Sequence, residues 1–143
     1  MDSKKFSLWL TLIIAGWLTT PSAMSKEAPN IAADVLIQTS QSWDGSILKS
    51  YPEGLPEVTI LRIKVLPGVQ LPLHQHPYLN AGVLLRGELT VTTVDKKTIL
   101  VKAGDAIVEV LDKWHYGKNT GQEIAEIIVF YAGVAGEPIT VKQ

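Results

Sequence analysis

The stretch LPLHQHPYLN, residues Leu71–Asn80, contains two of the three histidines of this 143-residue chain. Alternate side chains of a β-strand share a face, so an extended segment here points His74 and His76 the same way and Gln75 the other way. Two prolines bracket the pair and stiffen the segment that presents it. The two imidazoles are either part of a metal site or polar residues on the surface of a strand.

Strand signals dominate the chain after residue 56. Short runs rich in Val, Ile, Leu and Thr, each bounded by Gly, Pro, Asp or Asn, occur in EVTILRIKVLPG, NAGVLLRGELTVTTV, KTILVKAGDAIVEVL and EIAEIIVFYAG. Because no amphipathic run long enough for a helix interrupts them, the pattern predicts an all-β sandwich or barrel. The third histidine, His115, follows the apolar run DAIVEVLDKW and is expected at the end of that strand. A barrel would bring it close to His74 and His76.

The spacing of these residues resembles the two sequence motifs of the cupin family. The first motif is matched by Gly68, five residues, His74-Gln75-His76, three residues, Asn80, six residues and Gly87; the second by Gly104, five residues, Val110, one residue, Asp112, two residues, His115, three residues and Asn119. The chain departs from the family by carrying Asn80 in place of Glu, Val110 in place of Pro and Asp112 in place of Gly. The resemblance implies a single jelly-roll (cupin) β-barrel, in which His74, His76 and His115 converge on a divalent metal. It also implies a homodimer formed through the outer strands.

Three neutral imidazoles suit Fe, Mn, Zn, Ni or Cu, and they leave positions on the ion open for water or substrate. The alternative is a set of structural histidines that line a cavity without metal. An amide oxygen is a weak neutral ligand and no base, so it stays open whether Asn80 contacts the ion. Glu109 is held as a reserve ligand or catalytic base, although a solvated carboxylate at the barrel rim is the usual case.

Other polar and aromatic residues lie near the histidines in sequence. Glu88 begins the run GELTV and is expected to point outward. Arg86 shares the alternation of Asn80 and is a candidate for binding an anionic substrate, with a solvated strand end as the alternative. The aromatic neighbours of the histidines either line the pocket or pack at its rim: Tyr78, Trp114 and Tyr116.

Composition and the N-terminus limit the functional classes. A net charge of −1 and a pI near 6.3 leave no excess of Lys and Arg to neutralise phosphates, which argues against a nucleic-acid partner. The absence of cysteine excludes disulfides, thiolate ligands and a cysteine nucleophile. Residues 1–25 combine two lysines, an apolar run and small residues, the order of a secretory signal peptide. The run from Phe6 to Leu18 reaches only about 20 Å, short of a membrane layer of about 30 Å.

The sequence is therefore divided into a signal peptide (1–25), an N-terminal arm with short strands (26–57), a cupin β-barrel (58–131) and a C-terminal tail (132–143). The mature protein is expected in the periplasm or secreted, away from the membrane. Three functions stay open, because a fold does not dictate a function. They are a metal-dependent dioxygenase- or isomerase-like enzyme for a small organic substrate, a non-catalytic binding module for a sugar or organic acid, and a metal-free dimerising barrel.

Overall fold

The computed structural model describes residues 31–143, so the predicted signal peptide lies outside the described residues. The described part of the chain forms nine strands: β1 (Pro56–Val65), β2 (His74–Gln75), β3 (Asn80–Arg86), β4 (Glu88–Thr93), β5 (Thr98–Lys102), β6 (Ala106–Val108), β7 (His115–Lys118), β8 (Ala125–Val134) and β9 (Val141–Lys142). Over the same residues there is no helix long and apolar enough to span a membrane. The predicted all-β fold is confirmed.

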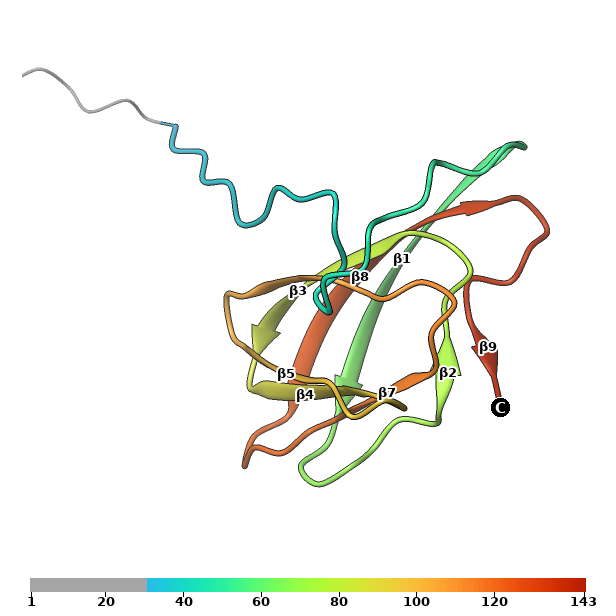
Figure 1. Cartoon of the computed structure of the whole chain (residues 1–143). Coiled ribbons are helices and arrows are strands. Elements are labelled where there is room, and N and C mark those ends of the chain that lie inside the picture. Colours follow the sequence, from blue (N-terminus) through green and yellow to red (C-terminus); the bar gives the residue numbers. More distant parts are fainter. Residues whose placement is uncertain (1–30) are drawn as a thin grey trace, which may run out of the picture. The chain divides into compact units, whose positions relative to one another are not determined.

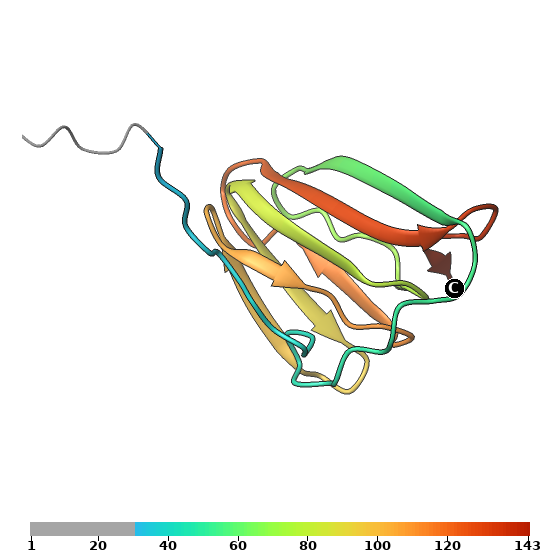
Figure 2. The same ribbon diagram turned by 90° about the horizontal axis from the view of Figure 1, so that it is seen from above.

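The strands form two antiparallel sheets that face each other (Figures 1 and 2). The four-stranded sheet has the order β1-β8-β3-β6, and the five-stranded sheet has the order β5-β4-β7-β2-β9. Neighbouring strands in each sheet are mostly distant in sequence, and the chain passes from one sheet to the other several times. This crossing topology is that of a jelly-roll barrel.

Alternation along the strands sorts side chains into an interior and an outer face. In β8 the inward set includes Ile127, Val129 and Tyr131, which are buried, while Phe130 between them is 42% exposed. The buried core joins both sheets and consists of Val65, Leu84, Leu89, Val91, Val101, Ile107, Ala125, Ile127, Val129 and Tyr131. Burial of these aliphatic side chains is the main stabilising term of the barrel.

Turns with left-handed backbone join the strands. Gly68 (φ 76°), Gly87 (φ 73°) and Gly104 (φ 95°) adopt the region that glycine enters without steric cost. At Gly87 a Cβ would also meet the carbonyl oxygen of Ile124 at 2.7 Å, so a side chain is excluded there for two reasons. These are three of the glycines that define the spacing of the two sequence motifs.

The placement of His115 differs from the sequence-based expectation. His115 does not end the strand that precedes it: β6 stops at Val108, and His115 is the first residue of β7. Asp112 adopts a left-handed conformation (φ 50°), and its N–H donates to the carbonyl of His76 (2.9 Å). The segment between β6 and β7 therefore leaves the four-stranded sheet and enters the five-stranded one.

A loop of residues 39–48 and the C-terminal tail both contact the barrel. Residues 31–55 contain one isolated bridge, between Gln41 and Ile47, and no longer strand. We call residues 39–48 the arm loop; its Trp43 N–H donates to the carbonyl of Val108 (2.9 Å), and its Ser42 hydroxyl donates to the carbonyl of Glu109 (2.8 Å). In the tail, β9 pairs with β2.

Candidate metal centre

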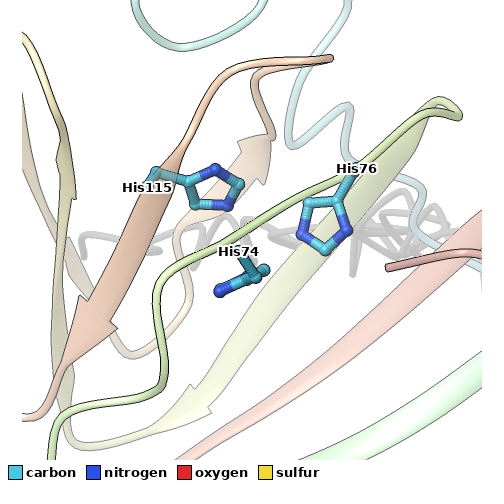
Figure 3. Close-up of side chains that lie close together, drawn as sticks. All are labelled: His74, His76 and His115. Atoms are coloured by element: carbon cyan, nitrogen blue, oxygen red, sulfur yellow. The ribbon is translucent and has the colours of Figure 1, made fainter. Parts of the chain in front are cut away.

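The three histidines meet inside the barrel. His74 and His115 are direct partners in the pairing of β2 with β7. Their ring centroids lie 4.5 Å apart, and the ring of His76 lies 4.9 Å from His74 and 5.1 Å from His115. Figure 3 shows the three rings turned toward a common space. The alternation argument is consistent with this placement, because the cavity is lined by His74 and His76 and not by Gln75.

Backbone carbonyls fix the tautomer of all three rings. The Nδ1 atom of His74 lies 2.7 Å from the carbonyl of Pro72, that of His76 lies 3.0 Å from Ile139, and that of His115 lies 2.8 Å from Lys113. A carbonyl only accepts, so each Nδ1 carries the hydrogen. Each Nε2 then presents a lone pair, and the Nε2 of His115 is buried without a hydrogen-bond partner.

The donor set fits a metal ion. One ligand nitrogen from each histidine lies within 4.8 Å of the others. Small ring rotations reduce such spacings to the roughly 3–4 Å that metal–nitrogen bonds of about 2.1 Å require. The carbonyl held by each Nδ1–H is the arrangement that orients metal-binding histidines in other sites. Three histidines that could hold a metal ion are therefore brought together by the fold.

Burial keeps the imidazoles neutral. Desolvation lowers the pKa of His76 to about 4, and the neighbouring histidines lower it further while its carbonyl partner opposes the shift. Desolvation also lowers the pKa of His74 and of His115. Neutral imidazole is the form that binds metals, so at pH 7 no proton has to leave these rings first.

Two buried asparagines, both 0% exposed, behave differently. Asn119, at the end of the second motif, is fully paired: its amide donates to the carbonyls of Val65 (2.8 Å) and Glu123 (2.7 Å), and its oxygen accepts from Gly121 (2.9 Å). Asn80 makes a single long contact, from Nδ2 to the carbonyl of Tyr78 (3.4 Å), and its Oδ1 has no partner. Buried polar atoms are usually paired, as those of Asn119 are, which gives Asn119 a structural role. Asn80 instead presents an unpaired oxygen to the cavity.

Glu109 lines the same cavity and is not a rim residue. Its side chain is 13% exposed, and Oε2 lies 3.7 Å from His115 Nε2 without a hydrogen-bond partner. Burial raises the pKa of Glu109 to about 7, against the opposing influence of His74 and Trp43. The Trp43 indole N–H makes no hydrogen bond of normal geometry, so it lowers the pKa of Glu109 only weakly. The expectation of a solvated carboxylate does not hold, because the carbonyl of Asn80 accepts from the Glu109 N–H (3.1 Å) and places Glu109 beside the site.

Sequence reasoning did not single out Tyr131 as part of the site. Its ring lies 5.4 Å from that of His76, and Asn80 is its partner in the pairing of β3 with β8. Burial, together with the charge of Glu109, raises its pKa to about 12, so the hydroxyl keeps its proton at neutral pH. The inward alternation of β8, shared with Val129, was the available signal. The aromatic residues next to the histidines in sequence do not line the cavity.

Arg86 and Glu88 lie away from the histidines. A register shift between Leu84 and Arg86 interrupts the alternation that linked Arg86 to Asn80. The Arg86 side chain is exposed and pairs with Glu123 (2.9 Å), so it is not placed to bind a ligand in the cavity. Glu88 accepts a hydrogen bond from Thr120 (3.3 Å) outside the cavity, in agreement with its predicted outward direction.

The cavity at the histidines is small. Its volume is about 40 Å³. One water occupies roughly 10–15 Å³ of such a cavity, so the space suits an ion with a few coordinated atoms. Aliphatic side chains make up most of the remaining wall, which is formed by Ile63, Val65, Leu71, Leu89, Val91, Gly117, Ile127 and Val129. The polar groups thus sit at the end of an apolar interior.

The fold and the histidine cluster define a small β-barrel with a histidine-lined interior, and comparisons with known proteins agree with the fold. The family model for the cupin domain matches residues 61–131. The chain belongs to the cupin superfamily. No curated protein matches the chain by sequence.

Solved structures of similar fold include a cupin-like protein from Thermotoga maritima, with 19% identity, a TM-score of 0.55, and coverage of 60% of this chain and 64% of that protein. A DMSP lyase from Ruegeria pomeroyi has 19% identity and a TM-score of 0.52, with coverage of 69% and 47%. An oxalate decarboxylase from Lactobacillus farciminis has 20% identity and a TM-score of 0.53, with coverage of 59% and 26%. This chain therefore spans less than two thirds of each of these proteins, and at such identities the likeness concerns the fold alone.

Proposed function

We propose that this protein is an exported metal-binding cupin in which His74, His76 and His115 hold a divalent transition metal, and that it is a dioxygenase- or isomerase-like enzyme acting on a small organic substrate. The observation that carries the proposal is the convergence of three neutral imidazoles whose Nδ1 atoms are all occupied by backbone carbonyls. A set of merely structural histidines would have no reason to leave the Nε2 of His115 buried without a partner beside the other two rings.

The residues around the proposed ion would have different roles in the reaction. When bound, the ion supplies a Lewis acid that polarises a substrate oxygen. The protonated hydroxyl of Tyr131 is available to donate a hydrogen bond to a small substrate, and the aliphatic wall excludes water from the reacting groups. The volume of about 40 Å³ favours a substrate of a few heavy atoms over a flavonoid or a sugar ring.

Metal content tests the first part of the proposal. Protein purified from the periplasm, and metal-free protein reconstituted separately with Fe, Mn, Zn, Ni and Cu, are analysed for bound metal. We expect close to one transition-metal ion per chain with at least one of these metals. If none is retained after any reconstitution, the metal site is refuted.

A substrate panel tests the second part. Oxygen uptake is measured with phenols, flavonols and small diketones, and product formation is measured with oxalate and DMSP because solved cupins of similar fold include an oxalate decarboxylase and a DMSP lyase. We expect turnover of a small compound that disappears in metal-free protein. Saturable binding of an organic acid without turnover would support the alternative, a non-catalytic binding module, in place of the enzyme.

The proposed homodimer has a candidate face. The outer face of the four-stranded sheet exposes Val58 (59%), Ile60 (63%) and Phe130 (42%) beside the charged residues Lys64 and Glu126. A patch with an apolar centre and both signs of charge is complementary to itself across a twofold axis. Phe130→Glu is expected to give a monomer in sedimentation experiments, whereas Leu100→Glu, on the exposed side of the other sheet, leaves the dimer intact. Wild-type protein that sediments as a monomer would contradict this.

Export rests on residues 1–25 and is tested directly. The intact mass of protein from the periplasmic fraction is expected to correspond to cleavage after Ala23 or Ser25, the small residues that follow the apolar run. Protein that keeps its N-terminus and stays with the cytoplasmic fraction would refute export.

A further inference from the structure

The cavity contains buried oxygen atoms without hydrogen-bond partners, and a metal site of three histidines alone does not explain them. In the described residues, the buried side-chain atoms without a partner are the indole nitrogen of Trp43, the oxygen of Asn80, Oε2 of Glu109 and Nε2 of His115. Three of these four belong to residues lining the histidine cavity. Hydrogen bonds within the described residues therefore do not account for the position of Oε2 of Glu109.

We propose that Glu109 is the fourth ligand of the metal, and that it supplies from the four-stranded sheet the carboxylate that the first cupin motif lacks at Asn80. This inference rests on the metal site proposed above. It assigns the oxygen ligand to a residue between the two motif positions Gly104 and Val110, where the motif specifies no side chain. Asn80 then borders the site without carrying its charge.

Geometry supports the assignment. Two ligand atoms bonded to one ion at about 2.1 Å lie between roughly 3.0 and 4.2 Å apart, for bond angles from 90° to 180°. The 3.7 Å between Glu109 Oε2 and His115 Nε2 falls within this range. The distance is too long for a hydrogen bond. A direct hydrogen bond therefore does not explain why these two atoms lie close together. The group of ligand atoms that lie within 4.8 Å of one another contains only the three histidines, so the Glu109 carboxylate has to turn toward His74 and His76 to complete the site.

Backbone hydrogen bonds hold Glu109 on both sides. Its N–H donates to the carbonyl of Asn80 (3.1 Å), which puts the two residues at adjoining positions on the wall of the cavity. Its own carbonyl accepts from the Ser42 hydroxyl (2.8 Å) in the arm loop. A side chain that starts from this fixed backbone position reaches the same space that a longer side chain at Asn80 would reach.

The charges near Glu109 favour a bound cation. Within residues 31–143, its carboxylate makes no ion pair with a lysine or arginine, and the basic groups near it are the histidines of the site, His115 and His74, whose pKa values burial lowers. A buried carboxylate without a cation is costly, and a metal ion removes that cost. A site of three histidines and one carboxylate also halves the net charge that the ion would otherwise keep.

The test is a transfer of the carboxylate, with Co²⁺ and Zn²⁺ as probes. Metal-free wild type, Glu109→Gln, and the double variant Asn80→Glu with Glu109→Gln are titrated against a competing chelator, and the visible absorption of the Co²⁺ forms is recorded. Glu88→Gln, which removes a carboxylate outside the cavity, is the matched control. Circular dichroism confirms that each variant is folded.

We expect Glu109→Gln to weaken metal binding by at least about 10-fold, to change the Co²⁺ absorption and to bind azide more tightly, because the ion keeps more positive charge. The double variant should recover most of the affinity and the spectrum. An unchanged Co²⁺ spectrum in Glu109→Gln would overturn the assignment even if the affinity fell, because it would show that Glu109 only positions other groups. If wild type binds neither metal, the histidine site itself fails; if wild type and Glu109→Gln bind equally while His115→Ala does not bind, only the role of Glu109 fails.

Discussion

The two sheets of the barrel bring different atoms to the cavity. The five-stranded sheet contributes nitrogen, from His74 in β2, from His76 directly after it and from His115 in β7. The four-stranded sheet contributes oxygen, from Asn80 in β3, Tyr131 in β8 and Glu109 directly after β6. The nitrogen set is fixed by strand pairing, because His74 and His115 are register partners. The oxygen set has more freedom, since several positions on the facing sheet reach the same space.

Substitution of a histidine should reduce metal affinity more than substitution of an oxygen-bearing residue. Replacing His115 with Ala is expected to reduce Zn²⁺ affinity by at least about 100-fold, because it removes one of three converging imidazoles. Gln75→Ala, the neighbour that does not line the cavity, should leave the affinity unchanged. Both are measured by competition with a chelator. Equal losses in the two variants would show that His74 and His76 do not face a common ion.

With Glu109 as the fourth ligand, the ion would be bonded to residues of both sheets, so metal removal should destabilise the two sheets together. At a free metal concentration of about 1,000 times Kd, binding adds about 4 kcal/mol to the free energy of unfolding. Thermal unfolding of the metal-free and metal-loaded proteins measures this difference as a lower Tm after chelation. His115→Ala should show little change in Tm upon chelation. An identical Tm for wild type with and without metal would contradict binding to the folded state.

The buried carboxyl of Glu109 should make the stability of the metal-free protein depend on pH. Glu109 has a pKa of about 7 in the folded state, against an ordinary value of 4.5, so the folded state loses stability as the pH rises from 4.5 through 7. Glu109→Gln removes this loss and should gain roughly 2–3 kcal/mol over wild type between pH 4.5 and pH 8. Urea unfolding in the presence of a chelator measures it. A constant difference across this pH range would mean that the carboxyl is not buried.

The smallest expected effect concerns the support of Glu109. Ser42→Ala removes the hydroxyl that donates to the Glu109 carbonyl (2.8 Å) and should cost about 1 kcal/mol of unfolding free energy. Thr39→Ala, which removes a hydroxyl from the exposed start of the arm loop, serves as the control and should cost less. Urea unfolding compares the two. Ser42→Ala with wild-type stability would show that the arm loop does not hold this part of the wall.

The sequence predicted more of the nitrogen side than of the oxygen side. Two histidines at two-residue spacing, and a third in a matching motif, make up all the histidine of this chain, so the amino-acid sequence alone links them. Glu109 lacks such a signal because both faces of the run AIVEVL are apolar, so alternation could not orient it. Alternation along the strand predicts that Tyr131 points inward, but no neighbouring residue in the sequence indicates that it lines a polar site. Arg86 was misplaced because a bulge, invisible to periodicity, resets the register after Leu84.

The arm loop has a practical consequence for anyone who shortens this protein. The family match begins at residue 61 and ends at residue 131, so a fragment cut to it lacks Ser42 and Trp43, which flank Glu109, and Ile139, whose carbonyl holds the ring of His76. Such a fragment would keep all three histidines and Glu109 while losing contacts that aim two of them. Metal affinity measured on it would understate that of the full barrel.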